Sequence, residues 1–415
     1  MKTIIITICL LTIGVYSYTQ AAMVVGYLPT YRFSSSSQIE YCKLTHLNLS
    51  FANPDSEGNL VIKSINSVMS DALSRNPSIC ICISLGGGSL TEQQKNNWSS
   101  LIDIPANRPA YISRIVDFVL ENRLDGVDMD LEWGDVTSGY SDFIIELDTA
   151  LSSHNKLLTV ALPNQTLFSN ISKEALNAFD FINIMSYDAT GPWKPSSPGQ
   201  HSSFAFSTNG INFWKNTIGV PGSKLILGVP FYGYDFVDLS TVNSVTYSQI
   251  VADNPGNADL DNVGNIYYNG RPTIESKVTL ANDEVAGIMI WEIGQDTFNE
   301  YSLLRTIHNT YTSLGITTTG LCGNEAASSF LASEFQKRCR IYPNPTSDYF
   351  TINMKGFKET TIKMTNTLGE IVTIRTAADD EDELFFDTSR LQKGIYFILI
   401  IDKENVPQTH KLILI

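Results

Sequence analysis

The chain has 415 residues, of which 43% are hydrophobic and 17% are charged. This length allows one large domain and a smaller one, and the composition is typical of a folded globular protein. The formal net charge is -15 at pH 7. Because nucleic acids and anionic membrane surfaces are bound chiefly through Lys and Arg clusters, this charge argues against both as partners. A neutral polymer such as a polysaccharide remains compatible with it.

The N-terminus predicts a secretory signal peptide over residues 1–22. Lys2 precedes an apolar stretch from Ile4 to Val15, and the small pair Ala21-Ala22 follows. A charged start, an apolar centre and small residues at the end are typical of such a signal. A transmembrane anchor is the alternative, but it needs about 20 apolar residues, more than this run provides. We therefore expect a secreted or cell-surface protein without membrane insertion.

Five cysteines remain after the predicted signal peptide. Cys80 and Cys82 lie in an apolar, strand-like stretch, where buried cysteines are common. Cys322 and Cys339 flank a linker-like segment, and export would permit a disulfide between them. The cysteine spacings do not suggest a metal site, and we expect no metal and no cofactor.

Residues 23–315 alternate short apolar runs with segments of helical periodicity. This alternation predicts a parallel sheet covered on both faces, and eight such units fit a (β/α)8 TIM barrel. A doubly wound open sheet is the alternative, but no glycine-rich dinucleotide turn follows the first run. The runs are Met23 to Tyr27, Thr45 to Phe51, Ile79 to Leu85, Gly126 to Glu132, Leu157 to Leu162, Phe181 to Tyr187, Leu225 to Phe231 and Ala286 to Trp291.

The alternation ends near Leu314-Gly315, and residues 316–340 have the composition of a linker. Residues 341–415 show short strand patterns separated by turns, which predict a small antiparallel β-sandwich. The acidic run from Asp379 to Glu383 is interpreted as a solvated turn. The predicted strands are Tyr349 to Asn353, Thr360 to Met364, Ile371 to Arg375, Gly394 to Ile401 and His410 to Ile415.

Three acidic residues, Asp128, Asp130 and Glu132, are spaced by two along the fourth run. A strand sends alternate side chains to one face, and in a barrel the other face meets helices, so the acids point inward. Buried carboxyls share protons and shift their pKa values. We expect Asp128 and Asp130 to share a proton and Glu132, at the C-terminal mouth, to stay protonated and donate to a leaving group. A solvated edge strand and a divalent-metal site are the alternatives.

The segment Asp125-Gly-Val-Asp-Met-Asp-Leu-Glu132 resembles the DGxDxDxE signature of glycoside hydrolase family 18. Further motifs resemble this family in the expected order and span residues 23–315. They are Ser84-Leu-Gly-Gly87 for SxGG, Met185-Ser-Tyr-Asp188 for MxYD, Gly228-Val-Pro-Phe-Tyr-Gly233 for the seventh strand, and Trp291 for the aromatic floor under the sugar.

The resemblance implies substrate-assisted, retaining hydrolysis of N-acetylglucosamine polymers. Glu132 would protonate the glycosidic oxygen while the acetamide of the substrate attacks the anomeric carbon. Asp130 would orient the acetamide, Asp128 would assist Asp130, Tyr187 would hydrogen-bond the acetamide oxygen, and Asp188 would hold the distorted sugar. The predicted substrate-binding residues are Trp291, Asp188, Met185, Tyr27, Tyr232 and Trp133, with Tyr31 and Trp193 as further stacking candidates; Trp98 and Trp214 are interpreted as packing residues.

About 50 residues separate the seventh-strand motif from the eighth run. The resemblance makes this segment short for the extra α+β insertion that walls one side of the groove in many processive members. A shallower cleft and endo-type cleavage are therefore expected.

The tail resembles a type IX secretion sorting domain through Ile341-Tyr-Pro-Asn-Pro345, Gly394-Ile-Tyr-Phe397 and the terminal Lys411-Leu-Ile-Leu414. The resemblance implies contact with the secretion machinery and removal of the tail during export. A carbohydrate-binding β-sandwich is the alternative, for which exposed aromatic side chains would be expected and are not indicated.

The sequence thus predicts a monomeric secreted chitinase acting on chitin or its oligosaccharides. An endo-β-N-acetylglucosaminidase on N-glycan cores and a non-hydrolytic sugar-binding protein remain alternatives. The presence of Glu132 argues against the second.

Overall fold

The computed structural model describes residues 22–318, 340–342, 346–353, 360–366, 371–377, 383–401 and 407–414. Contacts divide the chain into two compact units, residues 1–319 and 320–415. Almost all of the predicted signal peptide and linker lies outside the described residues. The bounds proposed for those two segments therefore stay predictions.

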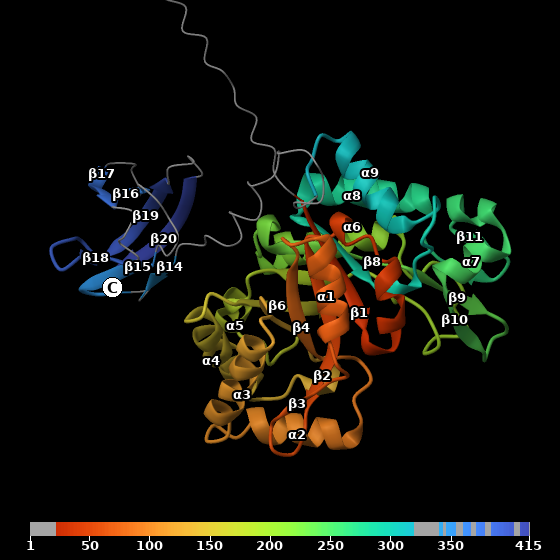
Figure 1. The fold of residues 1–415 in the computed structure, drawn as a ribbon, viewed down its shortest axis with the longest axis horizontal. Coiled ribbons are helices and arrows are strands. Elements are labelled where there is room, and N and C mark those ends of the chain that lie inside the picture. Colours follow the sequence, from red (N-terminus) through yellow and green to blue (C-terminus); the bar gives the residue numbers. More distant parts are fainter. Residues whose placement is uncertain are drawn as a thin grey trace, which may run out of the picture. The chain divides into compact units, whose positions relative to one another are not determined.

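Eight parallel strands of the first unit close into a barrel (Figure 1). Strand β1 pairs with β13 on one side and with β2 on the other, which completes the ring. The predicted (β/α)8 barrel is confirmed, and each strand overlaps its predicted run. The strands are β1 (Met23–Pro29), β2 (His46–Pro54), β4 (Cys80–Gly86), β5 (Gly126–Asp130), β6 (Leu157–Pro163), β7 (Ile182–Met185), β8 (Leu225–Pro230) and β13 (Gly287–Trp291); the short β3 (Leu60–Val61) pairs with β2.

Helices cover the outside of the barrel. The helix predicted at Pro109 is α3, which buries Ile112 and Ile115, whereas Leu120 of the same pattern is 37% exposed. The predicted packing residues Trp98 and Trp214 are both buried. The α-helices of this unit are α1 (Asn66–Arg75), α2 (Glu92–Ile102), α3 (Arg108–Glu121), α4 (Tyr140–Ser152), α5 (Lys173–Ala178), α6 (Phe204–Asn212), α7 (Tyr247–Asp253), α8 (Arg271–Glu284) and α9 (Leu303–Ser313).

Short helical segments complete the connections between strands and helices. They are η1 (Thr30–Gln38), η2 (Tyr41–Lys43), η3 (Trp133–Asp135), the π-helical η4 (Phe213–Ile218), η5 (Gly222–Lys224), η6 (Pro255–Asp259) and η7 (Ile293–Gln295). Of all helices in the described ranges, none has both the length and the apolar character needed to cross a membrane.

The segment between β8 and β13 is more than a loop. It forms a four-stranded antiparallel sheet in the order β10-β9-β12-β11 (Figure 1). Helix α7 follows β10 directly and precedes β11 in the chain. The expectation that this segment is too short for an α+β insertion is wrong, and the reason for expecting a shallow cleft falls with it. The strands are β9 (Tyr232–Phe236), β10 (Val242–Thr246), β11 (Asn262–Val263) and β12 (Ile266–Tyr267).

The second unit contains two antiparallel sheets, β14-β15-β18 and β17-β16-β19-β20. Both contribute to one hydrophobic core, with Phe350 and Ile352 from one sheet and Ile362 and Ile398 from the other. The five predicted strands are present, but β14 and β18 were not predicted. The strands are β14 (Arg340–Tyr342), β15 (Tyr349–Asn353), β16 (Thr360–Asn366), β17 (Ile371–Ala377), β18 (Glu383–Asp387), β19 (Gly394–Ile401) and β20 (Pro407–Leu414).

Exposed aromatic side chains are present in this second unit, contrary to the expectation. Tyr349 is 48% and Phe385 is 57% exposed. Their ring centroids lie 5.2 Å apart with the planes inclined by 26°. Because the two rings face each other, stacking with a neighbouring aromatic accounts for the pair without a ligand.

The cysteines differ in their state. Cys80 and Cys82 are free, and Cys82 is buried as its strand position predicted, whereas Cys80 is only half-buried. Cys42 is disulfide-bonded. Cys322 and Cys339 lie outside the described residues, so the disulfide between them stays a prediction.

Candidate active site

Strand β5 carries the acidic row into the barrel, and its first member is fully buried. Asp128 accepts four hydrogen bonds from neutral side chains, at distances from 2.6 to 3.3 Å. All four of its usual acceptor positions are therefore filled, as suits an ionised carboxylate. The donors are the Tyr27 and Ser84 hydroxyls on Oδ2, and the Thr159 hydroxyl and Asn183 amide on Oδ1.

The next acid has a different environment. Asp130 is buried, and its Oδ1 has no hydrogen-bond partner. The hydrogen bonds to Asp128 come from other residues, so the predicted proton shared between Asp128 and Asp130 is not seen in this state. A carboxyl that is buried and incompletely hydrogen-bonded favours its neutral form. The two aspartates thus differ in their surroundings: the hydrogen bonds to Asp128 favour its charged form, whereas the environment of Asp130 favours its neutral form.

The pKa directions agree with this division. Burial, together with the charges of Glu132 and Asp128, raises the pKa of Asp130 well above its usual range. Burial raises the pKa of Asp128 only to about 6, because its four hydrogen bonds oppose the shift. Burial and the charge of Asp188 raise the pKa of Glu132 to about 7. A carboxyl with this pKa retains a proton near neutral pH and can donate it in a reaction.

Glycines at the end of β4 make room for the acids. A Cβ on Gly86 would lie 2.7 Å from the carbonyl oxygen of Asp130, and one on Gly88 would lie 2.7 Å from Oε1 of Glu132. Gly86 also has a φ of +107°, which favours glycine. The Gly86-Gly87-Gly88 run is therefore a close packing surface for the acidic strand.

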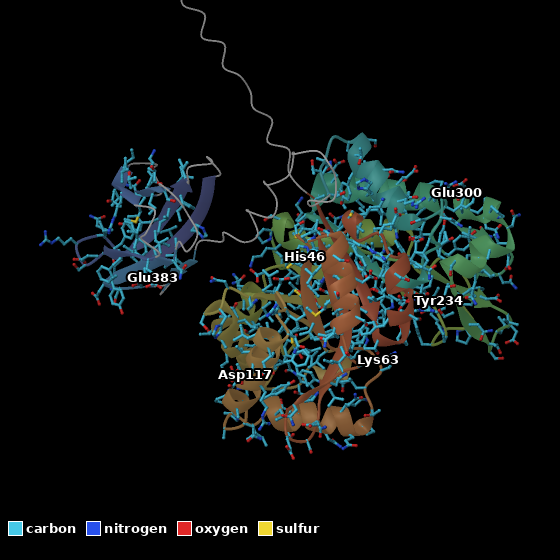
Figure 2. All side chains as sticks on the ribbon, viewed as in Figure 1. His46, Lys63, Asp117, Tyr234, Glu300 and Glu383 are labelled. Atoms are coloured by element: carbon cyan, nitrogen blue, oxygen red, sulfur yellow. The ribbon has the colours of Figure 1, made fainter. Side chains whose placement is uncertain are left out.

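Asp188 lies at the centre of a polar cluster after β7. Its Oδ1 accepts hydrogen bonds from the hydroxyls of Tyr232 at 2.5 Å and Tyr234 at 3.0 Å, both on β9; Figure 2 labels Tyr234. Nδ1 of the buried His201 lies 3.4 Å from the same oxygen. The φ of Asp188 is +65°, an unusual value for a residue with a side chain. The insertion between β8 and β13 thus supplies two of the groups that hold this carboxylate.

Tyr187 is buried beside this cluster. Its ring meets the Tyr232 ring edge-on, with centroids 6.3 Å apart. Burial raises the pKa of its hydroxyl well above the usual range, which keeps it a hydrogen-bond donor. A Cβ on Gly228 would lie 3.1 Å from the Tyr187 ring, so the seventh-strand glycine gives this ring its space.

The aromatic residues divide into buried and exposed groups. Trp291 stacks on Phe51 and contacts Tyr27 edge-on, each with centroids 5.6 Å apart. Tyr27 is 1% exposed, so it serves the acidic row through its hydroxyl and offers no open stacking surface, contrary to its prediction as a stacking residue. Trp133 and Trp193 are 62% and 58% exposed. Of the other predicted contacts, Met185 is half-buried at the end of β7, and Tyr31 is 66% exposed.

Sequence reasoning missed the polar partners of the predicted residues: Thr159, Asn183, His201 and Tyr234. Thr159 and Asn183 each interrupt an apolar barrel run, and a polar residue in such a run was an available signal. His201 and Tyr234 reach the site only through tertiary contacts. Among the described residues, no group of three or more His, Cys, Asp or Glu is arranged to hold a metal ion.

Comparison with known proteins identifies the barrel. The family model described as glycosyl hydrolases family 18 matches residues 23–296. The chain belongs to glycosyl hydrolases family 18. A second model, the secretion system C-terminal sorting domain, matches residues 340–415 and so covers the β-sandwich. Both resemblances stated from the sequence are confirmed.

Solved family 18 structures share the fold. The chitinase ChiB from the chitin utilization locus of Flavobacterium johnsoniae is 54% identical with a TM-score of 0.72, covering 74% of this chain and 99% of that one. A chitinase from Bacteroides thetaiotaomicron is 31% identical with a TM-score of 0.61, covering 71% and 98%. A chitinase-like effector of Moniliophthora roreri is 24% identical over 57% of this chain and 64% of its own, so the match spans under two-thirds of that relative.

Gly88→Ala is expected to impair this family 18 site without unfolding the barrel. The new Cβ would lie 2.7 Å from Oε1 of Glu132, and the flexible carboxyl would move away from its working position. We expect kcat on a chitin oligosaccharide to fall by about 10- to 100-fold, the scale of a misplaced catalytic group. Gly134→Ala is the control, because a Cβ there meets nothing within 4 Å. Equal kcat values for the two variants would contradict the packing role of Gly88.

The pH profile is expected to depend on Asp188. The acid predicted from the sequence is the protonated form of Glu132, so kcat/KM is expected to fall as the pH rises through about 7. Asp188→Asn removes a negative charge that raises this pKa, so the fall should occur at lower pH. Asp135→Asn should move the profile in the same direction but less, because Asp135 raises the pKa less than Asp188 does. Normalised kcat/KM profiles measure the effect, and an unmoved profile for Asp188→Asn would refute the coupling.

Proposed function

We propose that this protein is a secreted chitinase that cleaves β-1,4 bonds between N-acetylglucosamine units with net retention of anomeric configuration. One observation carries the proposal: a protonatable Glu132, with its pKa raised to about 7, ends an inward row whose first acid is a fully hydrogen-bonded carboxylate. The named chitinases among its family 18 relatives support chitin as the substrate class.

The reaction begins with proton transfer. The Glu132 carboxyl donates its proton to the glycosidic oxygen as the bond between that oxygen and the anomeric carbon breaks. The carbonyl oxygen of the substrate's own acetamide attacks the anomeric carbon and forms a cyclic oxazolinium ion. Water then adds to the anomeric carbon, the bond between that carbon and the acetamide oxygen breaks and restores the acetamide, and the Glu132 carboxylate takes up a proton from this water. The carboxyl is thus restored and the product has the original configuration.

The second acid supports the acetamide. Asp130 accepts a hydrogen bond from the acetamide N–H through its unprotonated carboxyl oxygen, so it orients the acetamide and stabilises the positive charge that develops on the acetamide nitrogen. Asp128 stays in place as the anionic end of the row because four donors hold it. The row therefore runs from a fixed carboxylate, Asp128, through Asp130 to the proton donor, Glu132.

The residues after β7 would contact the reacting sugar. The Tyr187 hydroxyl donates a hydrogen bond to the acetamide oxygen and holds it in position to attack the anomeric carbon. The Asp188 carboxylate holds the distorted ring. Trp291, fixed by its stacking on Phe51, forms the floor under that sugar. Exposed Trp133 and Trp193 are candidates for stacking on further sugar rings.

Glu132→Gln tests the proposal. The substitution removes the acidic proton and little volume, so kcat on chitotetraose should fall by about 10²- to 10⁴-fold or more, while oligosaccharide binding by calorimetry is preserved. The wild type should release products whose new reducing end has the β configuration, as read by NMR. Glu121→Gln on the exposed end of α3 is the matched control and should keep full activity.

Different outcomes distinguish the alternatives. Hydrolysis of glycoprotein N-glycans without hydrolysis of chitotetraose would identify an endo-β-N-acetylglucosaminidase instead. Binding of chitotetraose without turnover by the wild type would identify a sugar-binding protein. Undiminished turnover by Glu132→Gln would overturn the assignment of the acid.

We further propose that residues 1–22 direct export and that the C-terminal sandwich is a sorting domain removed afterwards. The match of residues 340–415 to a secretion-system sorting domain supports this proposal. The mature extracellular protein should lack residues 341–415, which intact-mass measurement of the secreted protein would detect. A chain ending before residue 341 should remain in the producing cell yet keep its hydrolytic activity. Recovery of the secreted protein with its tail intact would contradict removal.

A further inference from the structure

A lysine is completely buried on α8, close to the insertion sheet. Nζ of Lys277 lies 2.7 Å from each of three acceptors: the carbonyl oxygen and the hydroxyl of Ser202, and Oδ1 of Asn269. These three neutral acceptors match the three N–H groups of an ammonium. Burial lowers the pKa of Lys277 to about 7. A charge in this environment is costly, which indicates that its contacts serve a purpose beyond filling space.

The Ser202 hydroxyl donates one hydrogen bond and accepts another. It donates to the carbonyl oxygen of Ser186 at 2.6 Å, so the hydroxyl oxygen accepts from Lys277. Asn269 also donates to the Ser202 carbonyl, at 2.9 Å. Lys277 thereby fixes Ser202, and Ser202 fixes the peptide group that immediately precedes Tyr187.

The neighbour of Ser202 holds the next residue of the motif. The Asp188 N–H donates to Nδ1 of His201 at 3.3 Å, and the Ala189 N–H donates to the His201 carbonyl at 2.9 Å. Because Nδ1 accepts, Nε2 carries the hydrogen and faces the Tyr232 carbonyl oxygen at 3.3 Å. His201 thus restrains the left-handed backbone of Asp188 from two sides.

We propose that Lys277 is a positioning residue for catalysis: by fixing Ser202, and through it His201, it sets the positions of Tyr187 and Asp188 at the reacting sugar. The inference rests on the proposed function, because it assigns a role in the same reaction. Lys277 itself stays remote from the substrate and acts through the backbone of the motif.

A second lysine, the half-buried Lys224, lies near the start of a barrel strand and serves as a control. Nζ of Lys224 donates to the carbonyl oxygens of Asn177 and Phe179 at 3.0 and 2.7 Å, next to the start of β8. The active-site groups lie at the opposite, C-terminal ends of the strands. Lys224→Met should therefore cost stability without altering the site, whereas Lys277→Met should alter the site.

The test compares kcat and KM on chitotetraose for the full chain and its variants. Lys277→Met should lower kcat by about 10- to 100-fold, with a much smaller change in KM, because displaced Tyr187 and Asp188 lose contacts made mainly in the transition state. Lys224→Met should keep kcat within about twofold of the wild type, as expected of a distant, independent site. A kcat for Lys277→Met that equals the value for Lys224→Met would overturn the proposal.

Ser202→Ala tests the connection and covers the case in which Lys277→Met does not fold, as judged by circular dichroism. It removes the hydroxyl between Lys277 and Ser186, so it should also lower kcat. The double variant should lose no more than the more impaired single variant, because the two residues act in series. A wild-type kcat for Ser202→Ala, or full additivity in the double variant, would overturn the proposal.

The same assay tests the proposed function and the positioning role of Lys277 separately. An inactive wild type would overturn the proposed function, and the positioning role with it. An active wild type and an inactive Glu132→Gln variant, combined with unchanged kcat for Lys277→Met, would overturn the positioning role alone.

Discussion

Four hydrogen bonds to one buried carboxylate are the interaction on which the site depends. Taking an ion such as Asp128 out of water costs several kcal/mol. A hydrogen bond to a charged group returns about 1.5–3 kcal/mol, so a single donor would not offset that cost. The donors come from β1, β4, β6 and β7, and only a closed barrel brings these strands around one point. Asp128 therefore links the fold to the chemistry: the ring of strands stabilises its charge, and burial, the charge of Glu132 and this charge together raise the pKa of Asp130.

The second constraint is backbone strain after β7. Asp188 adopts a left-handed conformation, which is uncommon for residues other than glycine although Asp tolerates it better than most, and its surroundings hold it there. The groups that do so come from three places: His201 in the following loop, Tyr232 and Tyr234 on the insertion, and Lys277 on α8 acting through Ser202. The insertion thus contributes to the active site through the hydroxyls of Tyr232 and Tyr234.

The sequence predicts most of the barrel because a barrel strand is a local pattern of apolar residues with a fixed period. Two strands of the insertion, β11 and β12, could not be predicted because they are only two residues long each, too short to show a period. Strand β18 was missed because its first residue, Glu383, belongs to an acidic run. The acids are predictable because their spacing of two is local. Their partners are not, since Lys277 and Ser202 are 75 residues apart in the chain and meet only through packing.

The motif glycines show why the acidic residues alone would not define this site. A side chain at Gly86 would collide with the end of β5, and a Cβ at Gly228 would lie 2.3 Å from the carbonyl oxygen of Ile184. Either collision would push neighbouring strands apart. At Gly86 this would move hydrogen-bond donors away from Asp128, and at Gly228 it would fill the space that the Tyr187 ring occupies. The family motifs thus require positions without a side chain as well as positions with a carboxylate. A barrel with the same acids and larger residues at these positions would have the chemical groups of this site but not their distances.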